Sequence, residues 1–586
     1  AVFVPVSFLS GITGALYRQF SITIVVSVLL STVVALTLSP AMCAIILRPN
    51  RKKKNIVFRK INIWLAKGNN KYGHLLEKAI RNPRRILAGF GMVIVFIFVL
   101  NRVIPTSFIP EEDQGFFTVE LVMPEGATLE RTRKITDRAI AFIESLPAVA
   151  YVQNVTGSSA RVGTSQSRST LTVILKPWEE RKSSNMGVED VMEQCRKEFL
   201  YYPEILAYLN RPPVIPGLGE SGGLEMQLEA RGDASWENLV AATDTFMLYA
   251  SQAPELTGVS SALQSEIPQL YFNVDRDRAK FLGIPLTDIF STMKAYLGSV
   301  YVNDFNMFNR IYKVYIQAEA PYREHKENIN LFFVKAANGA MVPLTSLGNA
   351  SYTTGPGSIK RFNMFTTAVV LGSAAQGYSS GQAMEIMEQI AREHLPDNIG
   401  VEWSGLSYQE KKAGGQTGLV LTLVFLFVFL FLAAQYESWT VPIAVLLSLP
   451  VAALGAYLGV AVCGLENDIY FQIGLVMLVG LAAKNAILIV EFAKVQVDNG
   501  GDLVQSAIHA AQLRFRPILM TSLAFVLGML PMVLASGPGS ASRQAIGTGV
   551  FFGMIFAIVF GIVLVPFFFV LIYKAKEKVQ HKIKKD

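Results

Sequence analysis

Long apolar segments separated by polar ones set the hydrophobic pattern of this 586-residue chain. A helix that spans the hydrocarbon core of a bilayer needs roughly 17 to 25 mostly apolar residues, and seven segments meet this length. We predict spanning helices at residues 20–47, 86–104, 416–435, 440–460, 468–493, 516–536 and 547–573. The pattern therefore predicts a polytopic membrane protein.

The segment between the second and third predicted spans has a different pattern. Residues 105–415 contain no apolar stretch of spanning length and instead mix strand patterns with amphipathic helix patterns. The order strand, helix, strand is predicted at 115–123, 129–145 and 148–155, with a returning strand at 169–175, and again within 224–258 and 366–403. The predicted fold class is an α-helical polytopic membrane domain plus a large α/β domain of repeated, ferredoxin-like βαβ subdomains.

Charge orients the predicted spans. The formal net charge is +8, and residues 48–85 hold 13 Lys or Arg against the single acid Glu77. By the positive-inside rule this segment is cytoplasmic, and the spans that follow return the basic tail at 574–586 to the same side. Residues 105–415 then lie on the opposite, periplasmic side. The two basic segments account for the whole positive excess, so nucleic acid is not implied as a partner.

The basic segment at 48–85 also interleaves its charges with apolar residues such as Ile61, Trp64 and Leu65. This composition is typical of an amphipathic helix that lies on an anionic inner leaflet. An ordinary juxtamembrane linker is the alternative.

Enzyme and metal chemistry find little support in the sequence. The three cysteines and five histidines are scattered, so no metal or catalytic-triad spacing is present, and no P-loop pattern occurs. Residues 219–223 fit the nucleophile-elbow pattern around Ser221, but a strand follows the serine where the pattern needs a helix. We therefore predict no catalytic residue, no metal ligand and no cofactor, and an ion gradient as the energy source.

Lys484 is the most informative polar residue of the predicted spans. A charged side chain at the bilayer centre costs roughly 2.5 to 3.5 kcal/mol on insertion scales, so it persists where it faces a partner or a water-filled path. Asn485 adds a second polar group, and Arg514 and Thr521 follow seven residues apart on the next span. This set either carries a proton or only packs helices, because a lysine can form a static ion pair and a threonine can bond to its own backbone.

The first 47 residues loosely repeat the last two spans. FVPVSFLSGITG at 3–14 corresponds to MLPMVLASGPGS at 529–540, and Arg18 corresponds to Arg543 at a closely similar spacing. Internal repeats are the usual construction of secondary transporters. We therefore expect an earlier copy of the repeat unit to precede Ala1, which makes this chain the second half of a duplicated transporter.

Several segments resemble one family, in order, along the whole chain. GLVMLVGLAAKNAILIVEFAK at 474–494 and RFRPILMTSLAFVLGMLPMVLASG at 514–537 are similar to the fifth and sixth spans in the C-terminal half of resistance-nodulation-division efflux pumps. The same family is matched by FSITIVVSVLLSTVVALTLSPAMCA at 20–44, PEEDQGFF at 110–117, YVNDF at 301–305 and YESW at 436–439. Within it, the chain most resembles the AcrB-like hydrophobe/amphiphile exporters of Gram-negative bacteria.

The resemblance implies a multi-pass drug/proton antiporter of the inner membrane, which is driven by the proton motive force and works as a homotrimer in the lipid bilayer. It also implies a periplasmic adaptor (membrane fusion) protein and an outer-membrane channel protein as partners. The implied substrates are small-molecule drugs, detergents or bile salts. The family's aspartate pair would lie in the N-terminal half.

The resemblance also assigns the proton relay. Lys484 matches the relay lysine, Thr521 the relay threonine and Arg514 the arginine of the cytoplasmic proton route, with Asn485 beside the lysine. The relay cannot be complete in this chain alone, because the aspartates that would pair with the lysine are expected elsewhere.

The implied domain organisation places the end of the N-terminal repeat at 1–47, a cytoplasmic segment at 48–85, a span at 86–104, a first porter subdomain at 112–220, a second porter subdomain at 221–267 and 356–412, a docking subdomain at 268–355, a helical bundle at 416–573 and a cytoplasmic tail at 574–586. The docking region is matched by Tyr301, Asn303, Asp304 and Phe305.

Drug contacts in the family gather on a Gly- and Phe-rich loop of the first porter subdomain. The corresponding loop here, 157–165, begins with Gly157, Ser158 and Ser159 and contains no phenylalanine. We expect it to offer mobility and hydrogen bonds in place of aromatic stacking, and the pump to keep a broad specificity with altered preference. The neighbouring strand and the expected apolar wall supply Thr172, Phe116, Phe117, Tyr208 and Leu209.

Rival functions stay open from the sequence alone. A lipid or metal-ion exporter of the same superfamily is the nearest, although no Cys or His cluster or paired Met site supports a metal. A membrane-anchored scaffold subunit would not need Lys484. An anchored enzyme would need the catalytic context that Ser221 lacks.

Overall fold

The computed structural model describes residues 2–6, 11–46, 56–159, 161–183, 185–219, 222–375, 377–414 and 417–583. The chain forms two compact units, each with its own apolar core. The first unit consists of Ala1–Val122, Glu130–Ala262 and Arg361–Asp586, and the second of Met123–Leu129 and Leu263–Lys360.

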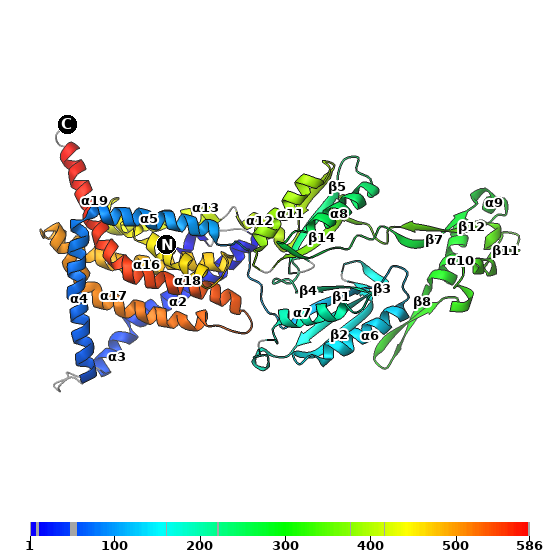
Figure 1. The fold of residues 1–586 in the computed structure, drawn as a ribbon, viewed down its shortest axis with the longest axis horizontal. Helices are drawn as coiled ribbons and strands as arrows, with labels where there is room; N and C mark the ends of the chain where they lie inside the picture. The colour runs from blue at the N-terminus through cyan, green and yellow to red at the C-terminus, as the bar shows by residue number, and fades with distance from the viewer. Residues whose placement is uncertain are drawn as a thin grey trace. The chain divides into compact units, whose positions relative to one another are not determined.

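Long apolar helices make up one part of the first unit (Figure 1). With the shorter helices and the basic helix α4 included, the helices of this part are, in chain order, α1 (Phe3–Val6), α2 (Gly11–Leu36), α3 (Leu38–Ile46), α4 (Ile56–Arg81), α5 (Pro83–Val103), α13 (Thr417–Tyr436), α14 (Val441–Leu446), α15 (Leu449–Val462), α16 (Ile469–Asp498), α17 (Leu503–Val533), α18 (Ser540–Phe556) and α19 (Ile562–Ile583). Within the described residues, six helical segments are long and apolar enough to cross a membrane, and Val420–Tyr436 is a shorter apolar helix. The predicted polytopic helical domain is confirmed.

Small residues let these helices approach closely. Helix α15 packs along α18, and α16 lies against both α17 and α18. A Cβ added at Gly459 of α15 would stand only 2.5 Å from the Phe552 side chain of α18. Close approach at small residues is a common way for helices to associate in lipid, because an apolar solvent supplies no hydrophobic drive between them.

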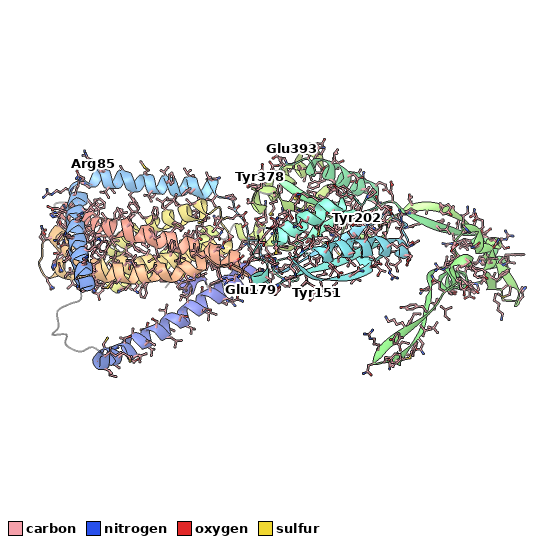
Figure 2. All side chains as sticks on the ribbon, turned by 60° about the horizontal axis from the view of Figure 1, so that its bottom comes forward. Arg85, Tyr151, Glu179, Tyr202, Tyr378 and Glu393 are labelled. Carbon is pink, nitrogen blue, oxygen red and sulfur yellow. The ribbon has the colours of Figure 1, made fainter. Side chains whose placement is uncertain are left out.

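Helix α4 packs one face on the spanning helices. The Tyr72 hydroxyl donates a 2.7 Å hydrogen bond to the Ile562 carbonyl oxygen, and the Tyr72 ring stacks on Phe515 with 5.0 Å between ring centroids. Lys71 is exposed. Arg85, which Figure 2 labels, lies in the first turn of the next helix, α5. The described part of the basic segment is therefore an amphipathic helix, whereas residues 48–55 lie outside the described ranges.

A four-stranded antiparallel sheet follows α5 in the chain. Helices α6 (Leu129–Ser145) and α7 (Val188–Phe199) connect its strands. The two strands joined by α6 are parallel to each other and separated by a third, which gives the β-α-β-β-α-β order of ferredoxin-like folds. In spatial order the strands are β2 (Val149–Ser159), β3 (Gly163–Leu175), β1 (Phe116–Val122) and β4 (Leu206–Asn210).

A five-stranded sheet repeats this order. Its elements run β5 (Leu224–Ala230), α8 (Trp236–Ala250), β6 (Leu256–Ser261), β14 (Phe365–Ala374), α11 (Ser380–His394) and β15 (Ile399–Trp403), followed by α12 (Gly405–Gly414). Strand β14 pairs with both β5 and β6, and also with the short β13 (Lys360–Phe362), while β15 pairs with β5. The predicted repetition of ferredoxin-like subdomains is confirmed.

Most of the second unit, Leu263–Lys360, lies between β6 and β14 in the chain. Strand β7 (Ile267–Val274) pairs with β12 (Gly348–Gly355), and β10 (Phe333–Lys335) with β11 (Met341–Pro343). Strands β8 (Val300–Met307) and β9 (Arg310–Ile316) form a hairpin. Helices α9 (Arg276–Phe281) and α10 (Leu286–Met293) bury residues such as Ala279 and Ile289 in the core of this unit.

Candidate functional site

Lys484 lies on α16, the helix that begins after Asp468. The Asp468 carboxylate caps this helix by accepting a 2.7 Å hydrogen bond from the Phe471 N–H. The Lys484 side chain is exposed in this chain, and its ammonium makes no ion pair or hydrogen bond with any residue that the structure describes. A lysine within an apolar span therefore needs a partner that the described residues do not supply.

Asn485, the next residue, is buried and points to α17. Its side-chain amide donates a 2.9 Å hydrogen bond to the hydroxyl of Ser522, which is also buried. A polar bond of this kind holds two membrane helices together. Sequence analysis missed Ser522, although its place directly after Thr521 in an apolar helix was an available signal.

Thr521 and Arg514 share α17 but have different surroundings. The Thr521 hydroxyl donates a 3.2 Å hydrogen bond to the Ile518 carbonyl oxygen, which is the backbone bond that competes with a relay role. The Arg514 guanidinium carbon lies 3.6 Å from the centroid of the Phe492 ring on α16. Among the described residues, no hydrogen bond joins Lys484 to Thr521 or Arg514, so the structure does not bring the three together directly.

A second polar cluster, which the sequence did not predict, lies before the start of α16. The Asn467 N–H donates a 2.8 Å hydrogen bond to the Pro105 carbonyl oxygen. This bond connects the segment that follows α5 to the segment that precedes α16. On α12, the Glu410 carboxylate accepts a 2.7 Å hydrogen bond from the Ser380 hydroxyl. Burial of this carboxyl, reinforced by the negative charge of Glu466, raises the pKa of Glu410 to about 7.

The predicted substrate loop is mostly β structure. Gly157, Ser158 and Ser159 belong to β2, which continues past the predicted strand end at residue 155 and pairs with Gly163 of β3. The connection is thus confined to residues 160–162, of which residue 160 lies outside the described residues. Ser159 is buried, and its hydroxyl donates a hydrogen bond to the Glu120 carboxylate. The described part of the loop is therefore anchored, in contrast to the expected mobility.

Strand alternation divides the other predicted pocket residues between two faces. Successive side chains of a strand point to opposite faces. Phe117 is fully buried on the core face of the four-stranded sheet, and Leu209, which pairs with the equally buried Val119, points to the same face. Phe117 therefore packs in the core of the sheet, whereas Leu209 is half-buried on the same face. Their part in a pocket wall stays a prediction. The opposite face takes Phe116, Thr172 and Tyr208.

This opposite face carries a buried cluster of charges around Glu120. The Arg161 Nε lies 3.3 Å from one Glu120 carboxylate oxygen, and the Arg168 Nη1 lies 3.1 Å from the other. All three side chains are at most 7% exposed. Buried charges are tolerated only where they are paired and hydrogen-bonded. The three charges therefore stabilise one another on this face of the sheet. The sequence pattern does not reveal the cluster, because it depends on which strands pair.

The predicted docking residues lie together on the β8–β9 hairpin of the second unit. The Tyr301 hydroxyl donates a 2.9 Å hydrogen bond to Asp304 Oδ2, and the Phe305 ring stacks on Tyr312 with 5.5 Å between centroids. Asn303 stands on the same strand. Every residue of β9, and nearly every residue of β8, is exposed.

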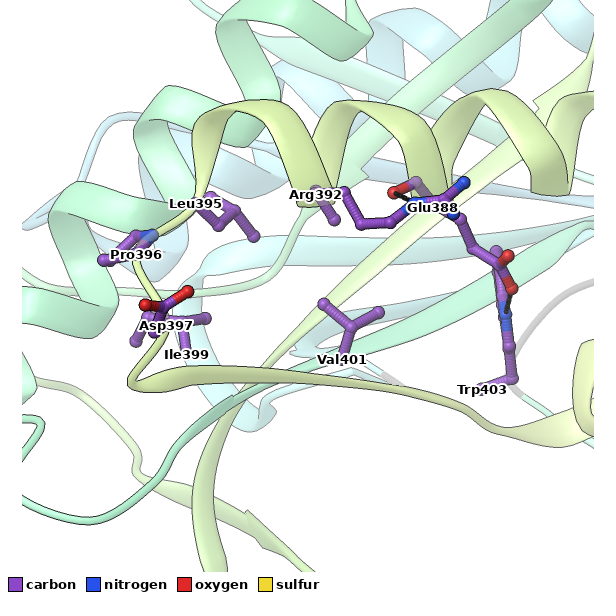
Figure 3. Close-up of a pocket in the computed structure, with 9 residues that line it drawn as sticks. Glu388, Arg392, Leu395, Pro396, Asp397, Ile399, Val401 and Trp403 are labelled. Atoms are coloured by element: carbon purple, nitrogen blue, oxygen red, sulfur yellow. Dashed lines mark hydrogen bonds between the residues drawn. The ribbon is translucent and has the colours of Figure 1, made fainter.

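A cavity of about 440 Å³ lies between α11 and β15 (Figure 3). Its lining combines apolar side chains, among them Val401, with charged ones such as Arg392. At one end the Trp403 indole N–H donates a 2.8 Å hydrogen bond to Glu388 Oε1, which also accepts a 2.5 Å hydrogen bond from the Lys411 ammonium. Sequence analysis did not predict this cavity.

The nucleophile-elbow pattern falls partly outside the described residues, because these exclude positions 220 and 221. Among the residues that the structure does describe, no group of three His, Cys, Asp or Glu side chains could hold a metal ion.

Comparison with known proteins relates almost the whole chain to one family. The model of the AcrB/AcrD/AcrF family matches residues 1–573. The chain is 40% identical over 579 residues to the multidrug/solvent efflux pump membrane transporter MepB and to the toluene efflux pump membrane transporter TtgB, both of Pseudomonas putida. It is 38% identical over 580 residues to the multidrug export protein AcrF of Escherichia coli.

Each of these alignments covers 98% of this chain but only 55% or 56% of the relative. The chain therefore spans about half the length of the curated relatives it matches. The names of MepB and TtgB describe membrane transporters, and that of AcrF describes an export protein. The chain belongs to the AcrB/AcrD/AcrF family of resistance-nodulation-division transporters, multi-pass proteins of the bacterial inner membrane.

Proposed function

We propose that this chain is the C-terminal portion of a proton-driven multidrug efflux transporter, a drug/proton antiporter. Membership of the family supports the class. The relatives' names mention multidrug, solvent and toluene efflux, which supports drugs and other amphiphiles such as detergents or bile salts as substrates. The observation that carries proton coupling is Lys484, an exposed ammonium on a long apolar helix without a partner among the described residues.

Lys484 would act by pairing with carboxylates from another part of the protein. A neighbouring ammonium favours the charged form of a carboxylate. When protons bind these carboxylates, the lysine loses its partners and is released to reorient, which supplies two states of different proton affinity. Because Asn485 joins α16 to α17, the change reaches the helix that carries Thr521 and Arg514, the hydroxyl and cation of the proposed proton route.

We propose the further partners on the family resemblance: a homotrimer, a periplasmic adaptor protein and an outer-membrane channel protein. The β8–β9 hairpin supports a contact with another chain, because an exposed two-stranded ribbon is at most marginally stable by itself. The hairpin residues proposed for docking are Tyr301, Asn303, Asp304 and Phe305. Within the family, CmeB is the finer assignment that we propose, also on resemblance.

The experiment that tests this function measures dye efflux from cells that produce the full-length protein. Wild type is compared with Lys484→Met at matched membrane abundance, with and without an uncoupler. Lys494→Met is the matched control, because Lys494 is another lysine of α16 whose ammonium has a structural partner, the Tyr436 carbonyl oxygen at 2.7 Å.

We expect the uncoupler and Lys484→Met each to abolish efflux while the protein stays folded, and Lys494→Met to retain uncoupler-sensitive efflux. Normal efflux by Lys484→Met would mean that the lysine is structural, and it would reject proton coupling through this residue.

A further inference from the structure

Residues 105–114, which we call the junction segment, lie between α5 and β1 and are bonded to a membrane helix at their start. The Asn467 N–H donates a 2.8 Å hydrogen bond to the Pro105 carbonyl oxygen, and the Ile469 N–H donates a 3.1 Å hydrogen bond to that of Phe108. Both donors lie where α16 begins. Backbone bonds therefore fix the start of the junction segment to α16.

Glu112 attaches the junction segment to a second membrane helix, α18. Its Oε1 accepts a 2.9 Å hydrogen bond from the Ser542 N–H and another from the Ser542 hydroxyl. Ser542 lies in the first turn of α18, where backbone N–H groups lack partners within the helix and the helix dipole favours a negative charge. Glu112 Oε2 is buried and has no hydrogen-bond partner among the described residues. The hydrogen bonds of this carboxylate within the described part of the chain thus all go to α18.

Close packing joins α18 to the helix that carries Lys484. A Cβ added at Gly549 of α18 would lie only 2.9 Å from the Phe471 ring of α16, so the α18 backbone lies directly against that ring. Close-packed interiors transmit displacements, because they contain little free space to absorb them. A movement of α16 when Lys484 gains or loses its partner therefore reaches α18 and the first turn that Glu112 contacts.

Asp113, the next residue, binds the α/β part of the first unit. Its Oδ2 lies 2.8 Å from Arg181 Nη1, and its Oδ1 lies 3.3 Å from Arg181 Nη2. The Arg181 side chain is only 2% exposed, and its Nε donates a 2.8 Å hydrogen bond to the carbonyl oxygen of Lys176, directly after β3. A bidentate pair of arginine and carboxylate fixes orientation as well as distance. Asp113 is therefore held firmly to the four-stranded sheet.

Glu111, the preceding residue, also binds the α/β part. It pairs with Arg211, which follows β4 and also pairs with Glu189 of α7. Among the described contacts, the ion pairs of Glu111 and Asp113 thus go to the α/β part, whereas the hydrogen bonds of the acid between them go to α18.

We propose that Glu112 is a positioning residue of the transport cycle, which makes α18 and the four-stranded sheet move together. The inference rests on the proposed efflux function and deepens it, because a drug/proton antiporter needs a connection between its proton site and its drug path. A shift of α18 displaces Glu112 through Ser542, and Asp113 passes the displacement to the sheet across one peptide unit. Loss of the contact leaves both parts folded but uncouples them.

The test measures proton flux into liposomes that contain the purified full-length protein and an enclosed pH-sensitive dye, under an imposed pH gradient. Rates are compared without drug and with ethidium or taurocholate. We expect Glu112→Ala to lower the drug-stimulated part of the flux about tenfold, a size within the range found for residues of a coupling network. The flux without drug should stay close to wild type. A residue with a merely structural role would lower both fluxes alike.

Three variants test the contact itself. Glu112→Gln keeps an oxygen that accepts both bonds from Ser542 and should restore at least about half of the stimulated flux. Ser542→Ala removes only the hydroxyl bond and should lower the stimulated flux about threefold. The double variant Glu112→Ala with Ser542→Ala should be no worse than Glu112→Ala alone, because the two residues act through one contact.

Glu111→Ala is the matched control. It removes a neighbouring acid of the junction segment whose partner, Arg211, keeps its second carboxylate, Glu189. We expect its stimulated flux to remain close to wild type.

An unchanged stimulated flux in Glu112→Ala, an equal loss in Glu111→Ala, or a parallel loss of both fluxes in Glu112→Ala overturns the proposal. If Glu112→Ala does not fold, Ser542→Ala decides, and a normal stimulated flux in that variant overturns it. A wild-type flux that responds to neither drug would reject the antiport, and this inference with it. A loss in Glu112→Ala beside a normal stimulated flux in Lys484→Met would retain Glu112 as the connection and reject only proton coupling through the lysine.

Discussion

The side-chain amide of Asn485 donates a 2.9 Å hydrogen bond to the hydroxyl of Ser522, and both residues are buried between α16 and α17. Each is preceded in the chain by an exposed residue of the proposed relay, Lys484 on α16 and Thr521 on α17. Successive residues of an α-helix are about 100° apart around its axis. The bond therefore fixes the rotation of both helices and sets the direction in which the lysine and the threonine point.

Ser522→Ala is expected to lower the uncoupler-sensitive efflux rate about tenfold at equal abundance. Without the hydrogen bond to Asn485 the two helices can rotate, and proton transfer between side chains tolerates little misplacement of the groups involved. Ser522→Thr keeps a hydroxyl and should restore most of the rate. Ser506→Ala is the control, since Ser506 is another buried serine of α17. Initial rates of dye efflux across a range of external pH provide the measurement. An unchanged rate and pH profile in Ser522→Ala would mean that the bond only packs the helices.

Close packing between α15 and α18 predicts a steric cost at Gly455. A Cβ added there would meet the Phe552 carbonyl oxygen and the Phe556 Cβ, both at 2.6 Å. The first of these is backbone and cannot rotate away. Gly455→Ala should therefore lower the free energy of unfolding by about 1–3 kcal/mol, the usual cost of overpacking. Thermal unfolding in detergent measures this loss of stability. Gly91→Ala of α5 is the control, because a Cβ at Gly91 has no described atom within 4 Å.

If Gly455→Ala unfolds at the same temperature as Gly91→Ala, then α15 and α18 shift apart at little cost. The packing drawn from the glycine contacts would then be wrong. A loss of stability in Gly455→Ala but not in Gly91→Ala would show that α15 and α18 pack closely at Gly455 in the folded protein.

Periodicity was enough to predict six of the long apolar helices and most strands, because burial of apolar residues against lipid or a sheet core leaves a regular pattern in the sequence. The span predicted at 416–435 corresponds to a shorter apolar helix, Val420–Tyr436, among the described residues. Periodicity also placed α6 at its observed bounds, 129–145. Strand alternation alone could also have shown that Phe116 and Phe117 do not line the same pocket wall, since they are neighbours on one strand and must face opposite ways.

Contacts between distant segments could not be predicted in this way. Arg161 meets Ser260 across 99 residues, and Asn485 meets Ser522 across 37. Such pairs depend on which sheets and helices become neighbours, and no periodic pattern records that. The carboxylate partner of Lys484 is a further case, because the described residues do not contain it.

Glu410 predicts a pH dependence of stability. Burial beside Glu466 raises its pKa from the ordinary 4.5 to about 7. Between these two pH values the unfolded chain releases the proton while the folded protein keeps it, so the free energy of unfolding falls as pH rises through this window. Glu410→Gln cannot ionise. It should therefore unfold at a higher temperature than wild type at pH 8, and close to the wild-type temperature at pH 5.

Thermal unfolding of wild type, Glu410→Gln and the exposed control Glu324→Gln at the two pH values tests this. If the unfolding temperature of Glu324→Gln rises as much as that of Glu410→Gln at pH 8, the cause is the change in net charge. Equal pH dependence in wild type and Glu410→Gln would mean that another group is responsible for the change in this window.

Glu388 joins two elements through one carboxylate oxygen, which accepts hydrogen bonds from the Trp403 indole and the Lys411 ammonium. Trp403 is 9% exposed, so Glu388→Ala leaves its N–H without an acceptor inside the sheet. An unpaired buried donor costs about 1–3 kcal/mol, and the unfolding temperature should fall accordingly. Glu388→Gln retains a carbonyl acceptor for the indole and loses only the exposed ion pair, worth about 0–1 kcal/mol.

The expected order of unfolding temperatures in detergent is therefore Glu388→Ala lowest, Glu388→Gln intermediate, and the exposed control Glu385→Ala, one turn earlier on α11, equal to wild type. Equal losses in the Ala and Gln variants would assign the stability to the Lys411 ion pair instead of the indole bond.

The ranking matters for the cavity beside these residues. If the indole bond dominates, Trp403 is a fixed wall of the 440 Å³ space, and ligands must fit its shape; if the ion pair dominates, the wall moves with α12.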